Sequence, residues 1–116
     1  MLKSMLVITM QIGIILTKTP SEIGFNTFLK FASLYGDKEE LSIYFIGNGV
    51  FSARKGHLKE DEVKKLLENS SIYAYLDDLN ARGISEDDLI EGIKIFESYD
   101  DLVVDIMENK DKVLSF

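Results

Sequence analysis

Residues 41–56, LSIYFIGNGVFSARKG, decide the fold of this 116-residue chain. An apolar run of β-branched and aromatic residues breaks at a Gly-x-Gly and restarts as a short amphipathic segment. This pattern predicts a strand, a tight turn and a helix. In an open α/β sheet such a junction lies at the carboxyl end of a strand, where ligands and partners usually dock. We therefore expect functional residues to gather there.

An apolar run from Met5 to Leu16 precedes that stretch, and its β-branched residues are typical of a strand covered on both faces. The run follows Lys3, as in a signal peptide. However, no small-x-small cleavage site follows it, and it is too short to span a bilayer. We expect residues 1–8 to be an N-terminal extension that packs elsewhere or lies in an oligomer interface.

Helices are predicted between the strands. Thr19 is expected to cap a helix that starts at Pro20, with Glu22 completing a capping box and Gly36 ending the helix. The apolar side chains of this helix recur at helical spacing and are expected to face the sheet. They are Phe25, Phe28, Leu29 and Ala32.

After the Gly47–Gly49 turn, the alternation of helices and strands continues to the end of the sequence. A short helix is expected to run to about Lys55 and stop at Gly56. The later elements are a helix at 59–68, a strand at 71–76, helical turns at 77–82 and from 85, a strand at 93–96, a helix from 98 and a strand at 113–116. The side chains expected to face inward from the two later helices are Val63, Leu66, Leu67, Leu102, Val103, Ile106 and Met107.

Such alternation predicts one α/β domain over residues 1–116, with three α/β/α layers and a mainly parallel sheet of about five strands. The net charge is −7, from 13 basic and 20 acidic residues, which opposes direct binding to nucleic acid. The sequence has no cysteine, which excludes disulfides, thiolate metal sites and a cysteine nucleophile. No cofactor, metal or catalytic residue is expected, and the expected partners include neither nucleic acid nor membrane.

The Gly-x-Gly junction has two interpretations. The backbone amides of Gly49 and Val50 can approach an anion at a helix start, or the glycines only allow a tight turn with close packing. The junction lacks the third glycine of a dinucleotide fingerprint and the Lys-Ser/Thr of a P-loop. Asn48 is expected to cap the helix or to contact a partner.

Other polar residues offer weaker signals. His57 is the only histidine and is expected to be a surface residue. Asp77 and Asp78 begin one helical turn, where they complement its dipole or contribute to a carboxylate metal site. Arg82 precedes Gly83 and is either a structural donor that binds loop carbonyls or a bidentate anchor for an acidic partner.

Three ordered motifs resemble the DsrE/DsrF/DsrH superfamily, and most closely its DsrH/TusB-like branch. They are IGNGV at 46–50, IYAYLDDLNARGI at 72–84, and YDDLV at 99–103 with VLSF at 113–116. The segment LTKTP at 16–20 also resembles the end of the first strand of that family. Together the motifs span nearly all of the chain from about Met10.

The resemblance implies a small α/β fold and a role in sulfur relay, toward wobble-uridine thiolation of tRNA or within sulfur oxidation. In DsrE/TusD-type subunits a cysteine before the Arg-Gly turn carries persulfide sulfur, and the matching position here is Tyr75. Tyrosine cannot form a persulfide. The resemblance therefore implies a non-catalytic, cytoplasmic subunit that assembles with itself or with cysteine-bearing relatives.

Two functions follow as hypotheses. The first is the sulfur-relay subunit, with partner contacts at the edge that carries Gly49, Tyr75 and Arg82, beside Asp77. The alternative is a homo-oligomeric module that binds a small anion or nucleotide at the helix start after Gly49, unrelated to sulfur transfer. An enzyme that uses His57 or the carboxylates ranks below both.

Overall fold

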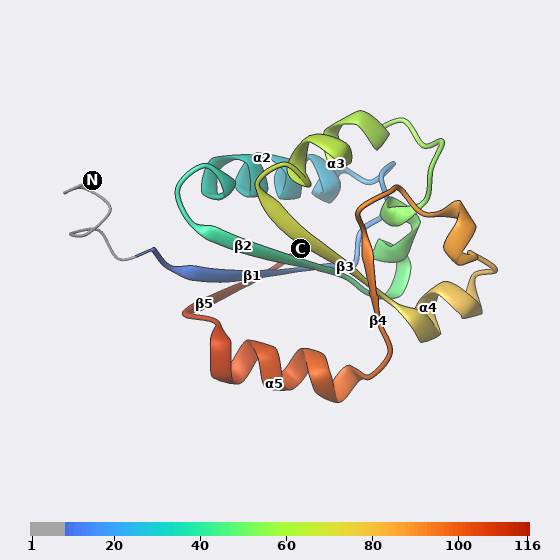
Figure 1. Ribbon diagram of the computed structural model, residues 1–116. Helices are drawn as coiled ribbons and strands as arrows, with labels where there is room; N and C mark the ends of the chain where they lie inside the picture. Colours follow the sequence, from blue (N-terminus) through green and yellow to red (C-terminus); the bar gives the residue numbers. More distant parts are fainter. Residues whose placement is uncertain (1–8) are drawn as a thin grey trace.

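The computed structural model describes residues 9–116, and its five strands form one sheet in which every pairing is parallel (Figure 1). The strand order is β4-β3-β2-β1-β5. The predicted parallel α/β fold is confirmed. The strands are β1 (Gln11–Leu16), β2 (Glu40–Phe45), β3 (Ser70–Tyr75), β4 (Lys94–Phe96) and β5 (Lys112–Ser115).

Helices cover both faces of this sheet, in three layers (Figure 1). Helices α2 (Ile23–Gly36) and α3 (Glu60–Leu66) lie on one face, and α5 (Tyr99–Asn109) lies on the other. Three short helices occur in the loops: the 3₁₀ helix η1 (Gly47–Ala53), α4 (Leu76–Ala81) and the 3₁₀ helix η2 (Glu86–Asp88). The second face is therefore covered by a single long helix.

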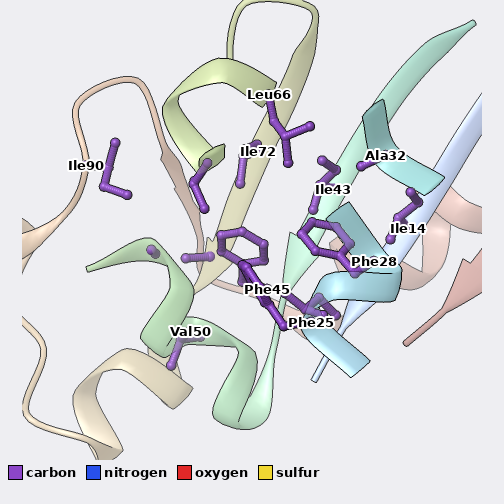
Figure 2. Close-up of a cluster of buried hydrophobic side chains, with 14 of the residues drawn as sticks. Ile14, Phe25, Phe28, Ala32, Ile43, Phe45, Val50, Leu66, Ile72 and Ile90 are labelled. Atoms are coloured by element: carbon purple, nitrogen blue, oxygen red, sulfur yellow. The ribbon is translucent and has the colours of Figure 1, made fainter. Parts of the chain in front are cut away.

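The main core lies between the sheet and the two helices α2 and α3 (Figure 2). The aligned residues Ile14, Ile43 and Ile72 of three adjacent strands are completely buried there. Phe28 of α2 packs edge-on against Phe45, with 6.2 Å between ring centroids. The predicted inward positions of α2 are confirmed, since Phe25, Phe28 and Ala32 are buried and Leu29 is partly buried against them.

The expected start of α2 at Pro20 is wrong, because the helix begins at Ile23. A turn precedes it, closed by the Glu22 N–H, which donates to the Thr19 carbonyl at 3.1 Å. The Glu22 carboxylate accepts from the Thr19 N–H at 2.7 Å, as the capping box requires. The Thr19 side chain contacts Ser21 and does not cap α2, so only half of the expected box forms.

Helix η1 also departs from the prediction, because it begins at Gly47 and ends at Ala53. The Gly49 N–H donates to the Ile46 carbonyl at 2.8 Å and closes the first turn. The glycines expected in a separate turn are therefore the first residues of a tight 3₁₀ helix. Helix α3 is likewise shorter than the expected range 59–68.

The inward face of α5 is narrower than predicted. Leu102 is buried and Ile106 is partly buried, but Val103 is 39% exposed and Met107 is 78% exposed. The expectation that Val103 and Met107 face inward is wrong. Since α5 lies alone on its face of the sheet, only one side of it has a neighbour to pack against.

Strand β1 occupies the second half of the long apolar run predicted as a strand. The extension expected at residues 1–8 lies outside the described residues. Within residues 9–116, no helix has both the length and the apolar character needed to cross a bilayer.

Candidate functional site

The carboxyl ends of β2 and β3 bring η1 and α4 together. Each of these short helices follows its strand directly, and adjacent parallel strands end at the same edge of the sheet. Asn48 of η1 and Arg82, the residue after α4, thereby meet across 34 positions of sequence. Both were singled out from the sequence, which did not pair them.

Arg82 binds both short helices at once. Its Nε and Nη2 donate to the Asn48 Oδ1 at 3.1 and 3.0 Å, and its Nη1 donates to the Asp78 carbonyl oxygen at 3.0 Å. The Arg82 side chain is 23% exposed. These are the contacts of a structural donor, the first of the two roles expected for Arg82, and they fasten α4 to η1.

Asp78 completes this cluster, whereas the sequence suggested only a helix-dipole or carboxylate-metal role for it. Its Oδ2 accepts from the Gly47 N–H at 2.6 Å, and its Oδ1 lies 3.4 Å from the Arg82 Nη1. The chain's own carboxylate thus holds a backbone donor at the start of η1. The signal that could have found it is the four-residue spacing between Asp78 and Arg82, which places both side chains on one side of a helix.

Gly49 and Val50 are buried, so the structure places them in the core and not on an exposed edge. A β-carbon at Gly49 would stand 2.0 Å from the Leu16 carbonyl oxygen. The Gly49 N–H already donates to Ile46. Gly47 has a positive φ of 54°. The two glycines thus serve different needs, close packing at Gly49 and a left-handed backbone at Gly47.

Tyr75 ends β3, and its ring stacks on Phe96 with centroids 5.0 Å apart. The Tyr75 hydroxyl donates to the Asp77 carboxylate at 3.0 Å, and Tyr99 lies beside the ring at 5.8 Å. The hydrogen bond to Asp77 raises the pKa of the Tyr75 phenol, and the nearby carboxylates add to the shift. Tyr75 is therefore a neutral phenol that lies between aromatic rings and the Asp77 carboxylate.

The His57 ring has both nitrogens engaged in local bonds. Its Nδ1 accepts from the Lys59 N–H at 3.0 Å, which assigns the proton to Nε2, and Nε2 donates to the Ser52 carbonyl at 2.9 Å. The ring is half-buried. His57 therefore holds the loop after η1 through both of its ring nitrogens.

The acidic pair Asp77 and Asp78 lies at a helix start, as the sequence predicted. Asp77 and Asp78 occupy the first turn of α4. Asp88 closes a capping box on Ser85 at η2. Across residues 9–116, no group of three or more histidine, cysteine or carboxylate side chains is arranged to hold a metal ion.

The fold places the chain in the class of three-layer α/β/α proteins with an all-parallel sheet. A model of the family described as "DsrH like protein" matches residues 18–112. The chain belongs to the DsrH-like family. It is also 33% identical, over 99 residues, to the uncharacterized protein MK0008 of Methanopyrus kandleri, a match that covers 78% of this chain and 79% of that protein.

Solved structures share the fold at low sequence identity. MTH1491 from Methanobacterium thermoautotrophicum, a protein of unknown function, superposes with a TM-score of 0.76 at 20% identity, over 92% of this chain and 99% of that one. The ychN protein from E. coli has a TM-score of 0.75 at 18% identity, over 94% and 100% of the two chains. These likenesses show that the fold is shared over nearly the whole chain.

Proposed function

We propose that this chain is a non-catalytic subunit of a sulfur-relay complex and that it assembles with cysteine-bearing relatives. Membership of the DsrH-like family supports the assignment. A persulfide is carried on a thiol, and the sequence has no cysteine. In such a relay the chain supports subunits that hold the sulfur.

The observation that carries the proposal is the environment of Tyr75. The motif match aligns this position with the sulfur-bearing cysteine of DsrE/TusD-type subunits, and here it holds a phenol bonded to Asp77 and stacked on Phe96. Beside it, Asp77 and Tyr99 are exposed. An aromatic surface with a carboxylate beside it is suited to contact a partner, because rigid aromatic rings lose little entropy when buried.

The clamp of Arg82, Asn48 and Asp78 keeps this edge in one shape. Since Arg82 joins η1 to α4, the loops that follow β2 and β3 present a fixed surface. Preorganised surfaces bind more tightly because less motion is lost on association. Asn48 is exposed and so lies at the outer side of the clamp.

The test is assembly with a cysteine-bearing DsrE-like protein from the same host, followed by native mass spectrometry and titration calorimetry. We expect a defined complex, and we expect Tyr75→Ala to weaken it at least tenfold. Tyr73→Ala is the matched control, because Tyr73 lies on the same strand and face but further from the carboxyl edge. Equal losses in both variants would contradict a contact at Tyr75.

A second readout tests the pathway. Deletion of the gene is expected to lower the fraction of thiolated wobble uridine in tRNA, or the rate of sulfur oxidation in a host that oxidises sulfur. Complementation with the Tyr75→Ala variant should restore less of the tRNA thiolation or sulfur oxidation than complementation with the Tyr73→Ala variant. Unchanged thiolation and unchanged sulfur oxidation after deletion would exclude the sulfur-relay role.

A further inference from the structure

A cleft lies between the segments that follow β1 and β2, at the carboxyl edge of the sheet. We call it the β1–β2 cleft, and its volume is about 310 Å³. Ligands of open α/β sheets usually bind at this edge, and small-molecule sites begin at roughly 300 Å³. Neither Tyr75 nor Arg82 lines the cleft. Its walls are residues 19–21, Phe51, Arg54, His57 and Leu58.

The charge of the β1–β2 cleft is opposite to that of the chain. The sequence has 20 acidic and 13 basic residues. Among residues 9–116, those that line this cleft include Arg54 and no aspartate or glutamate. The residues that line four other hollows of the same surface carry at least as many carboxylates as cations. An anion therefore meets less repulsion in the β1–β2 cleft than in those four hollows.

The guanidinium of Arg54 supplies the positive charge. Its Cζ lies 5.6 Å from the centroid of the Phe51 ring, so the ring helps to hold it in place. Within residues 9–116 this guanidinium forms no ion pair and donates no hydrogen bond. The only other arginine, Arg82, uses its donors on Asn48 and Asp78. Arg54 therefore keeps its fork of N–H donors for a ligand.

The carboxylate of Asp88 does not occupy that fork. Hydrogen bonds from the Ser85 N–H and hydroxyl, each at 3.0 Å, are the main cause of the lowered pKa of Asp88, and the charge of Arg54 adds to it. Asp88 nevertheless lies beyond ion-pair distance of Arg54. Since Asp88 is held by Ser85, it leaves the Arg54 donors accessible.

The wall formed by residues 19–21 presents two hydroxyl groups. The Thr19 Oγ1 and the Ser21 Oγ lie 3.1 Å apart and share one hydrogen bond. Only one of the two hydroxyl hydrogens is used in that bond, so the other can be donated to a ligand oxygen. The neighbouring Glu22 carboxylate accepts from the Thr19 N–H at 2.7 Å and does not line the cleft.

Apolar groups make up the rest of the β1–β2 cleft. Pro20 and the Phe51 ring are half-buried, and Leu58 is 92% exposed. A ligand with an apolar body would remove this surface from water, which is favourable. An inorganic anion would leave it uncovered. The lining therefore favours an anion that carries an apolar group.

Contacts within the chain hold both walls in place. The Ser52 hydroxyl donates to the Lys18 carbonyl at 3.4 Å and joins η1 to the segment after β1. The backbone of Arg54 pairs with that of Leu89 in an antiparallel bridge. His57 is held through both of its ring nitrogens. A cleft with fixed walls loses little motion when a ligand binds.

We propose that the β1–β2 cleft binds a small organic anion, in which a carboxylate or a phosphate is joined to an apolar or aromatic body. The Arg54 guanidinium pairs with two oxygens of the anionic group, and a hydroxyl of residues 19–21 adds a third donor. The apolar body lies against Phe51, Pro20 and Leu58. This site differs from the one expected at the start of η1, since Gly49 does not line the cleft.

The test is an NMR titration of the isotope-labelled chain with phenyl phosphate and phenylacetate, which carry the two anionic groups on similar bodies. We expect at least one of them to bind with a Kd of about 1 mM or tighter and to shift the amides of both walls. The tighter compound identifies the anionic group. Inorganic phosphate and benzyl alcohol, which each lack one half of the ligand, should bind at least tenfold more weakly.

Two variants of Arg54 test its role with the tighter compound. Arg54→Gln should raise the Kd at least tenfold, and Arg54→Lys, which keeps the charge without the planar fork, at least threefold. Lys55→Gln is the matched control, because it removes the same charge from the next residue, outside the cleft. It should change the Kd less than twofold. All three substitutions are at exposed positions.

Four outcomes would overturn the proposal. They are the absence of shifts in the walls with both compounds, binding of inorganic phosphate or benzyl alcohol as tight as that of the better compound, equal losses in Arg54→Gln and Lys55→Gln, and an unchanged Kd in Arg54→Lys. Because the titration uses this chain alone, its result is independent of the test of the sulfur-relay role.

Discussion

Gly49 lies against the end of β1 so closely that a β-carbon there would stand 2.0 Å from the Leu16 carbonyl oxygen. The Leu16 carbonyl is held by the Ile46 N–H at 3.1 Å, so it cannot turn aside without losing that bond. The contact fastens η1 to the strand beside it. It also explains why the stretch at 41–56 needs glycine at position 49, in addition to Gly47 and Gly56, whose φ is positive.

Gly49→Ala is expected to destabilise the chain by about 3 kcal/mol or more, because backbone must move to admit the methyl group. Gly47→Ala is the matched control, since nothing lies within 4 Å of a β-carbon there and only the positive φ is unfavourable. Its expected cost is about 1–2 kcal/mol. Urea denaturation of both variants measures the difference, and equal losses would contradict the close packing of Gly49.

The bond between Arg82 and Asn48 is expected to show energetic coupling. Arg82→Ala removes donors from the Asn48 Oδ1 and from the Asp78 carbonyl, and should cost about 2 kcal/mol. A double-mutant cycle with Asn48→Ala should give a coupling free energy of roughly 0.5–2 kcal/mol. Additive losses would show that η1 and α4 are fastened by other contacts.

Asp88 is expected to make stability depend on pH in acid. The N–H and hydroxyl of Ser85 bond to its carboxylate and lower its pKa below the ordinary value of 3.8. A lowered pKa means that the stabilisation is complete above the unfolded-state pKa and is lost as the pH falls through the folded-state value. The Tm should be measured between pH 2 and 7. It should fall less toward low pH in Asp88→Asn than in the unmodified chain.

That comparison has a control in Asp87, which lies next to Asp88 and has no hydrogen bond to Ser85 among those found in residues 9–116. The Tm of Asp87→Asn should fall toward low pH as much as that of the unmodified chain. An identical pH profile for Asp88→Asn and the unmodified chain would show that the capping box does not contribute in solution.

The Tyr75 phenol is expected to ionise at higher pH than an ordinary tyrosine. The bond to the Asp77 carboxylate is the main cause, so Asp77→Asn should lower the pKa of Tyr75 toward 10. Absorbance titration near 295 nm, with Tyr75→Phe to identify the transition, measures it. Because Asp100 also raises the pKa of Tyr75, Asp100→Asn should lower it less than Asp77→Asn.

Much of the fold is readable from local patterns. The β-branched runs that became β1, β2 and β3, and the glycines at the ends of helices, depend on residues within one turn or one strand. The start of α2 was misplaced because Pro20 and Glu22 fit a capping box at Thr19, whereas the structure uses that box only in part and inserts a turn. Whether such a motif starts a helix depends on the path that the backbone takes between the end of β1 and the start of α2.

The candidate site was only partly predictable. Asn48, Asp77 and Arg82 carry side chains whose chemistry marks them in the sequence, but the partner of Arg82 lies 34 positions away. Val50 was selected for a backbone amide at a helix start, and its side chain is fully buried in the core. The periodicity of apolar residues in α5 did not reveal that Val103 and Met107 stay exposed. Such periodicity shows which side of a helix is apolar, but it does not show whether another element packs against that side.

The sequence by itself determined the class of sheet, the positions of its strands and the absence of any thiol to carry sulfur. These properties follow from composition and short-range periodicity. Only the tertiary structure decided that Arg82 clamps Asn48 and that Leu16 forces glycine at 49. Those relationships depend on strand order and on the packing of distant segments, which spacing along the chain does not encode.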